Sequence, residues 1–175
     1  ELTCTPYTSV LEGIPIEGYV EAIESARVRA AAELGLELAW IFDIPGEIGP
    51  EAPMRTARIA VDHGPPSLVG FGLGGPEVGN PRPKFKPAFD LARAAGLRSV
   101  PHAGETTGAQ TVWDALRVLG AERIGHGIAS AQDDGLLAHL AEQGIPLEVC
   151  PTSNVATRAV PGYDDHPLPR LVAAG

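Results

Sequence analysis

Two short segments of this sequence contain the residue types that hydrolytic enzymes use. The segments His102-Ala103-Gly104-Glu105 and Arg123-Ile124-Gly125-His126-Gly127 each follow a short apolar run that is typical of a buried strand. Imidazole binds metal ions, and a carboxyl group beside it can donate or accept a proton. A histidine and a glutamate at one strand end, with a second histidine at the next, therefore predict a hydrolytic metal site.

The glycines within these segments favour a reacting site over a packed core. Gly104 permits a tight turn that brings Glu105 back toward His102. The glycines on either side of His126 leave room around its imidazole ring. A lone histidine at a strand end is more often a structural hydrogen-bonding residue, so the combination carries the prediction. The remaining histidines are assigned to structure or surface: His63, His139 and His166.

Three known motifs do not fit the sequence. The glycine run at 70–75 lies within and at the end of a predicted strand, and Pro76 delays the helix that a dinucleotide-binding loop requires at once. A zinc-protease motif needs two histidines on one helix, which is not the pattern here. A cytidine-deaminase site needs H-x-E followed by P-C-x-x-C, whereas Cys150-Pro151 has the reverse order. The glycines at 70–75 are better explained as positions where a ligand approaches the backbone closely.

The composition is that of an acidic globular protein. The 175 residues are 44% hydrophobic, enough for one domain with a core, and the net charge of −9 argues against binding to nucleic acid. No apolar run approaches the ~18 residues of a membrane-spanning helix, so no membrane partner is expected. Cys4 and Cys150 make no disulfide framework, and no signal segment is evident. We therefore expect a cytoplasmic protein.

Strands and helices alternate along the chain, and most helices end at a glycine. Repeated strand–helix–glycine–strand units are typical of an α/β protein with a parallel sheet. The apolar runs predict strands at 1–5, 36–44, 68–73, 98–101, 123–124 and 145–150. The helical periodicity predicts helices at 16–34, 51–63, 87–95, 109–119 and 133–143.

Polar residues follow successive predicted strands, which favours a closed barrel over an open doubly wound sheet. In a barrel all strand ends converge on one mouth, whereas residues on well-separated strands of an open sheet would not meet. The residues at these positions are Asp43, Gly75 with Glu77, His102 with Glu105, His126, and Ser153 with Asn154.

Four segments together resemble the adenosine deaminase family of zinc aminohydrolases, in the family's order and at similar spacing. They are residues 73–77 (Leu-Gly-Gly-Pro-Glu), 102–105 (His-Ala-Gly-Glu), 123–127 (Arg-Ile-Gly-His-Gly) and 147–154 (Leu-Glu-Val-Cys-Pro-Thr-Ser-Asn). The resemblance spans nearly the whole chain and implies a (β/α)₈ TIM barrel with one zinc at its mouth. Residues 1–175 would then form a single incomplete barrel domain of about six β/α units.

The resemblance also implies roles for individual residues. His102 would be a zinc ligand, and Glu105 would be the acid that protonates the purine ring at N1. His126 would orient the zinc-bound hydroxide and assist proton transfer. Both Glu105 and His126 are therefore expected to be catalytic. Substrate binding is assigned to three residues: Gly75, through its backbone N–H, Glu77 and Ser153.

Two family motifs are missing from these residues. The family carries an N-terminal His-x-His and a C-terminal Asp-Asp segment, which supply the other zinc ligands, so only one of four ligands is present. We interpret both ends of the sequence as cuts through a larger fold, and we expect the 175-residue chain by itself to be inactive. The barrel would be incomplete, and its edge strands would be exposed.

The expected activity is zinc-dependent hydrolytic deamination of a 6-aminopurine nucleoside, a small-molecule partner, with release of ammonia. Gly75-Pro76-Glu77 replaces the Gly-Asp-Glu of adenosine deaminases, and the Gly-Pro-Glu version is closer to relatives that deaminate aminodeoxyfutalosine in menaquinone synthesis. Free adenine is a third candidate substrate. Two other classes of protein remain alternatives. A two-metal amidohydrolase usually has a carboxylated lysine on a middle strand, and it is disfavoured because Lys84 and Lys86 are not at a strand end. The second alternative is a non-catalytic binding protein of the same fold. The sequence does not indicate an oligomeric state.

Overall fold

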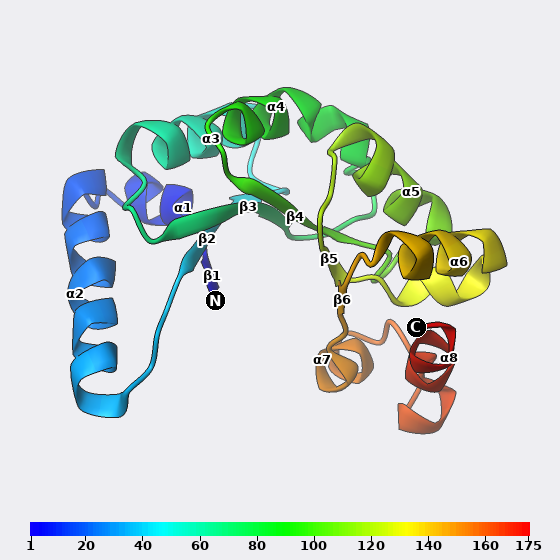
Figure 1. The fold of residues 1–175 in the computed structure, drawn as a ribbon. Coiled ribbons are helices and arrows are strands. Elements are labelled where there is room, and N and C mark those ends of the chain that lie inside the picture. Colours follow the sequence, from blue (N-terminus) through cyan, green and yellow to red (C-terminus); the bar gives the residue numbers. More distant parts are fainter. The chain divides into compact units, whose positions relative to one another are not determined.

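The computed structural model describes all residues from Glu1 to Gly175, and they form two compact units. Unit 1 comprises Glu1–Gly75 and Phe85–Ser99, and unit 2 comprises Pro76–Lys84 and Val100–Gly175. Each unit consists of parallel strands accompanied by helices (Figure 1). The expectation of a single domain over 1–175 stays a prediction.

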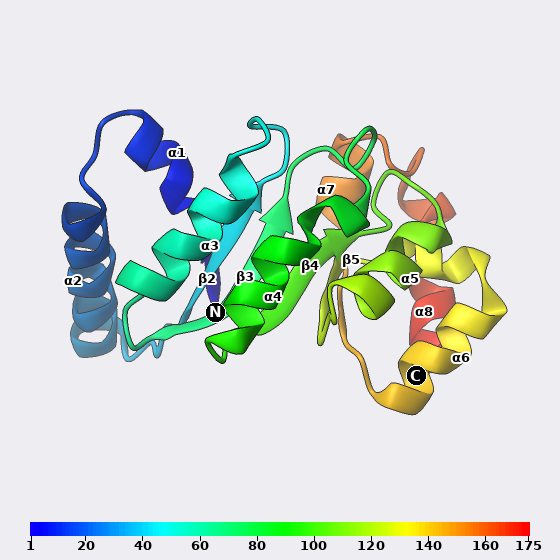
Figure 2. The same cartoon turned by 90° about the horizontal axis from the view of Figure 1, so that it is seen from above.

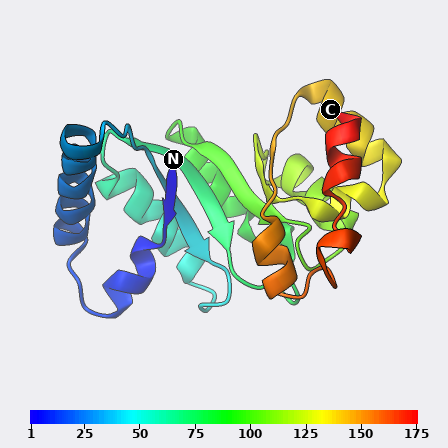
Figure 3. The same ribbon diagram turned by 90° about the horizontal axis from the view of Figure 1, so that it is seen from below.

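Unit 1 contains three parallel strands that pair in chain order. They are β1 (Leu2–Cys4), β2 (Trp40–Pro45) and β3 (Leu68–Gly74). The helices of this unit are α1 (Pro6–Leu11), α2 (Ile16–Leu34), α3 (Ala52–His63) and α4 (Lys86–Ala94). Helices α3 and α4 cover one face of β2 and β3 (Figure 2), and β1 runs beside β2 (Figure 3).

The core of unit 1 forms between this sheet face and its two covering helices. Phe71 of β3 and Phe89 of α4 are fully buried, and their rings meet edge-on with centroids 5.2 Å apart. Helix α2 matches the predicted bounds and ends at Gly35, whose φ of +66° is the left-handed conformation that glycine adopts without strain. Strand β2 begins four residues later than predicted, because pairing with β3 starts only at Trp40.

Unit 2 also contains parallel strands in chain order. They are β4 (Arg98–Ala103, whose first two residues belong to unit 1), β5 (Ile124–His126) and β6 (Leu147–Glu148). The α-helices are α5 (Ala109–Val118), α6 (Asp134–Gln143), α7 (Pro151–Ala156) and α8 (Leu168–Ala174). Short 3₁₀ helices are η1 (Arg82–Phe85, whose last residue belongs to unit 1), η2 (Ile128–Gln132) and η3 (Tyr163–Asp165). The core of this unit joins Ala103, Val112, Ala115, Ala121, Ile124, Leu136 and Leu140.

The strands that carry the candidate residues differ from the predicted ones at their ends. Strands β4 and β5 are longer than expected and include His102 and His126 within the ladder. The strand predicted at 145–150 is only two residues long, because Pro151 already begins helix α7. No helix in the structure is long and apolar enough to cross a membrane.

Candidate active site

His102 and His126 meet through an irregular end of strand β5. In the parallel register His102 lies opposite Gly125, and His126 lies opposite Ala103. Ala103 is fully buried in the apolar core, so regular alternation would send the side chain of His126 toward the core as well. His126 instead has a φ of +63°, and its ring lies edge-on against the ring of His102, with centroids 4.9 Å apart.

The left-handed backbone conformation of His126 is energetically unfavourable, and the surrounding structure holds it in place. A non-glycine residue in this conformation costs on the order of 1–3 kcal/mol, and such residues cluster at functional sites. Gly127 continues the left-handed turn with a φ of +67°, and its N–H donates to the Ala103 carbonyl at 3.0 Å. This hydrogen bond holds the turn against the end of β4.

The two glycines that flank His126 make room for other residues. A Cβ at Gly125 would lie against the His102 ring, with Cγ and Nε2 both at 3.1 Å. A Cβ at Gly127 would lie 2.6 Å from a methyl group of Leu147. Gly125 therefore makes room for the ring of His102, whereas space was predicted around the imidazole of His126. Gly127 allows Leu147 to pack closely against the backbone.

The turn predicted at Gly104 is present, and it brings Glu105 to His126. Gly104 has a φ of +70°, and its carbonyl accepts the Ala129 N–H at 2.9 Å. Glu105 Oε2 then lies 3.4 Å from His126 Nε2. The other carboxylate oxygen, Oε1, lies 3.1 Å from the hydroxyl of Thr157, just beyond α7. The carboxyl group of Glu105 is thus held at the end of β5.

Glu77 is buried beneath the residues that follow Glu105. Its Oε2 accepts hydrogen bonds from the backbone N–H groups of Thr106 at 2.6 Å and Thr107 at 3.0 Å. Burial raises the pKa of Glu77. The hydrogen bonds from these N–H groups and the charge of Arg82 lower it by a larger amount, so the net pKa lies below the ordinary value. Glu77 is therefore an ionised group within the scaffold, and its predicted contact with substrate stays a prediction.

Arg82 links Glu77 to strand β4, and the sequence analysis did not single it out. Its side chain is fully buried, with Nη1 4.0 Å from Glu77 Oε1. The same Nη1 donates to the His102 carbonyl at 2.6 Å, and Nη2 donates to the Asn80 carbonyl at 2.7 Å. The Glu77–Arg82 pair therefore holds the backbone on both sides of the Gly104 turn.

His102 has the electrostatic state that a metal ligand requires. Burial, and then the electrostatic influence of the neighbouring His126 ring, lower the pKa of His102 from 6.5 to about 4. The imidazole is neutral at neutral pH, so a ring nitrogen lone pair is available to a zinc ion. No group of three or more His, Cys, Asp or Glu side chains in the structure could hold a metal ion. The chain thus offers one fitting donor rather than a complete metal site.

Two other predicted substrate residues take no part in the contacts described above. Gly75 follows β3 in unit 1, where its φ is +83° and a Cβ would meet the carboxylate of Glu47. The glycines at the end of β3 thus accommodate carboxylates of the chain itself, since a Cβ at Gly74 would lie 2.8 Å from Asp43 Oδ2. Ser153 is exposed on α7. The substrate contacts of Gly75 and Ser153 stay predictions.

Asn154 and His166 complete the surroundings of His126. Asn154 Nδ2 lies 3.0 Å from His126 Nδ1, and Asn154 Oδ1 lies 3.2 Å from His166 Nε2. Asn154 appeared among the polar residues after the strands, but its partner could not be inferred. His166 precedes a proline in a predicted loop, and nothing local to it indicates that it is buried.

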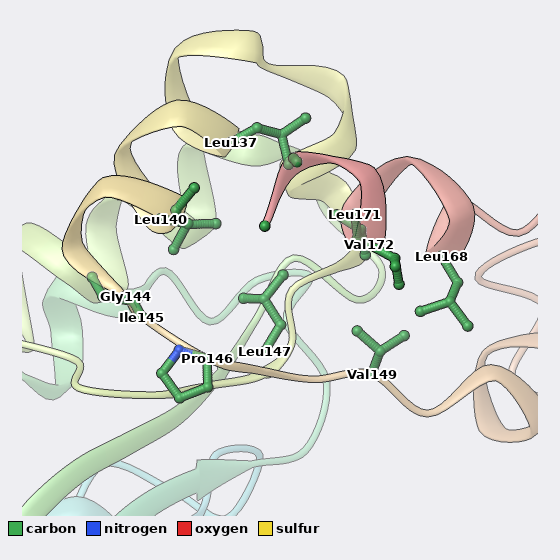
Figure 4. A pocket seen from close by; sticks show the side chains of 13 residues that line it. Leu137, Leu140, Gly144, Ile145, Pro146, Leu147, Val149, Leu168, Leu171 and Val172 are labelled. Atoms are coloured by element: carbon green, nitrogen blue, oxygen red, sulfur yellow. The ribbon is translucent and has the colours of Figure 1, made fainter.

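An apolar cavity of about 460 Å³ lies elsewhere in unit 2, between α6, β6 and α8 (Figure 4). The labelled side chains that point into it are apolar, among them Leu140, Leu147 and Leu171. None of the candidate catalytic residues lines it. The cavity offers no polar side chain to orient a purine, so it is not the candidate site.

Comparison with known protein families identifies the family of this chain. The model of the adenosine deaminase family matches residues 1–175, and the chain therefore belongs to this family. It is 63% identical over 177 residues to the aminodeoxyfutalosine deaminase of Streptomyces avermitilis, covering 100% of this chain and 49% of that protein. It is 38% identical to the adenine deaminase of Sinorhizobium medicae, covering 100% and 54%. The chain thus spans about half the length of these relatives.

Solved structures show the same relationship. The adenine deaminase from Arthrobacter aurescens matches 99% of this chain and 53% of its own, with a TM-score of 0.92 and 34% identity. An amidohydrolase from Burkholderia ambifaria with bound zinc matches 99% of this chain and 49% of its own, with a TM-score of 0.91 and 28% identity. The predicted fold class, an incomplete (β/α)₈ barrel, is confirmed by this likeness.

Proposed function

We propose that the full-length protein catalyses zinc-dependent hydrolytic deamination of a 6-aminopurine nucleoside. The observation that carries this proposal is the cluster of a neutral His102, the edge-on ring of His126 and the carboxyl group of Glu105. This cluster brings together a metal donor, a group that can orient water and an acid at the ends of the adjacent strands β4 and β5. The family membership supports the same reaction class.

In this proposal each residue of the cluster has one task. His102 supplies a nitrogen ligand. Zinc, when bound, lowers the pKa of water to about 7 and so provides hydroxide at neutral pH. His126 orients the attacking oxygen, and Glu105 donates a proton to N1 of the purine as negative charge develops there. One water adds its oxygen to C6; one of its protons replaces the proton that Glu105 gave to N1, and the other leaves with ammonia.

Within this class we propose aminodeoxyfutalosine as the substrate. The support is the 63% identity to an aminodeoxyfutalosine deaminase, against 38% to an adenine deaminase. Pro76 agrees with this choice, since it stands where adenosine deaminases have an aspartate in the resemblance described above. The proline lacks the polar carboxylate of that aspartate.

The test measures ammonia release by the zinc-loaded full-length protein from aminodeoxyfutalosine, adenosine and adenine. We expect the highest kcat/KM with aminodeoxyfutalosine and a loss of turnover with unchanged zinc content in Glu105→Gln. A preference for adenine or adenosine would contradict the proposal that aminodeoxyfutalosine is the substrate. Near-normal deamination by Glu105→Gln would overturn the acid role. A protein that releases no ammonia from any of the three would instead be a non-catalytic member of the family.

A further inference from the structure

A chain of hydrogen bonds fixes which ring nitrogen of His126 carries the proton. It starts at the backbone N–H of Leu168, which lies 3.0 Å from His166 Nδ1. A backbone N–H can only donate, so Nδ1 of His166 must accept. The hydrogen of the neutral His166 ring is therefore on Nε2.

The side-chain amide of Asn154 contacts both His166 and His126, so the tautomer of His166 determines that of His126. His166 Nε2–H donates to Asn154 Oδ1 at 3.2 Å, which leaves the amide NH₂ facing His126 Nδ1 at 3.0 Å. The opposite orientation of the amide would direct its NH₂ at the Nε2–H of His166, and two donors would face each other. Nδ1 of His126 is thus an acceptor, and its ring hydrogen is on Nε2.

Because these residues are buried, this series of hydrogen bonds determines the tautomer of the His126 ring. Asn154 is 0% exposed, His166 6% and His126 7%, so water has little access to replace any of the three partners. A buried donor or acceptor left without a partner costs about 1–3 kcal/mol, and an inverted chain would leave several. His126 Nε2 lies on the other side of the ring from this series of hydrogen bonds, 3.4 Å from Glu105 Oε2.

We propose that Asn154 and His166 are positioning residues that hold His126 in the Nε2–H tautomer. His126 then acts at the reacting centre as a hydrogen-bond donor to the attacking oxygen, and it does not remove a proton through Nε2. This inference rests on the proposed deaminase function for the identity of the reacting centre. The tautomer itself depends only on the contacts of unit 2.

The direct test is nitrogen NMR of the full-length protein with ¹⁵N-labelled histidine rings, in its zinc-free and zinc-loaded forms. We expect a protonated, pyrrole-type signal for Nε2 of His126 and an unprotonated signal for Nδ1, with both assigned by their absence in His126→Gln. A wild-type protein with the hydrogen on Nδ1 would overturn the proposal without the use of any further variant.

Variants of the two positioning residues connect the tautomer to turnover. Asn154→Asp places a carboxylate oxygen opposite Nδ1, so the ring hydrogen should move to Nδ1 and kcat should fall about 10²–10⁴-fold with little change in KM. His166→Phe should give a mixture of tautomers, and His166→Gln should restore part of the Nε2–H form because its amide can again donate to Asn154. Thr152→Ala, exposed on the same helix, is the matched control and should change neither measurement.

The outcomes separate this inference from the proposed function. Asn154→Asp that retains wild-type kcat with a shifted ring hydrogen would refute the positioning role. Active enzyme whose His126 carries its hydrogen on Nδ1 would refute the inference and leave the deaminase function intact. A protein that deaminates no aminopurine but shows the Nε2–H form would refute the proposed function and leave the tautomer assignment intact.

Discussion

Adding one methyl group at Gly125 should displace the only predicted zinc ligand of this chain. Gly125 lies opposite His102 in the β4–β5 ladder, and a Cβ there would lie 3.1 Å from both Cγ and Nε2 of the ring, with Cδ2 nearer still. Ordinary contacts between such atoms are about 3.5–4.0 Å. The ring must therefore move by roughly 1 Å. The backbone of Gly125 is not left-handed, so alanine adds no conformational strain of its own.

The backbone of His102 cannot move to relieve the contact, because Arg82 holds its carbonyl at 2.6 Å. The ring must therefore rotate in the space it shares with His126. Overpacking of this kind costs about 1–3 kcal/mol of unfolding free energy. A ligand displaced by this amount should bind zinc about 10–100-fold more weakly, and kcat should fall on the order of 10²-fold.

The assay is a zinc titration of the full-length Gly125→Ala protein against a competing chromophoric chelator, together with kcat and thermal unfolding. Gly18→Ala is the matched control, since Gly18 lies in helix α2 with nothing within 4 Å of a Cβ. It should leave zinc affinity unchanged and raise stability by about 0.5–1 kcal/mol. A folded Gly125→Ala protein with the zinc affinity of the wild type would refute the contact argument.

Three further predictions concern the scaffold and the metal. Glu77→Gln should lower the free energy of unfolding by about 3–5 kcal/mol, because it removes the carboxylate charge beside the buried guanidinium group of Arg82. Since the pKa of Glu77 is lowered by folding, its contribution is present above the unfolded pKa of about 4.3 and is lost as the pH falls through the lower folded value. Urea midpoints between about pH 3 and 6 should therefore fall more steeply with acidification for the wild type than for Glu77→Gln, and equal slopes would contradict the assignment. Gly104→Ala, with a φ of +70° and a Cβ 2.5 Å from Val112, should cost about 2–4 kcal/mol, whereas Gly144→Ala, with a φ of +61° in open space, should cost about 1–2 kcal/mol in the same denaturation series. Chelation of zinc from the full-length protein should abolish ammonia release and readdition should restore it, whereas activity that persists in metal-free protein would exclude a zinc requirement.

Periodicity and turn chemistry were sufficient to predict most elements of the fold. Helix α2 was predicted at its observed bounds, since apolar spacing and the stop at Gly35 are local signals. The strand predicted at 145–150 was too long, because an apolar run does not show where pairing to a neighbour ends. Helix α7 was missed for the same reason, as its six residues follow that run directly.

The candidate residues were predictable as a group but not in their contacts. His102, Glu105 and His126 were identified from residue type and strand-end position. The sequence indicated that Glu105 turns back toward His102, whereas the structure places its Oε2 3.4 Å from His126 Nε2. The difference arises from the left-handed backbone at His126, which reverses the direction of that side chain and has no pattern of its own in the sequence.

The strand–helix order, the glycine turns and the residue types at the strand ends were predictable from the sequence, because these depend on neighbours close along the chain. The contacts of Asn154 and His166 with the ring of His126 were not. These contacts join residues 28 and 12 positions apart. They exist because packing brings α7 and the segment before α8 against the end of β5 and excludes water from the three side chains. Which polar group faces which in such a buried chain follows from non-local geometry, and no local pattern of residues carries that information.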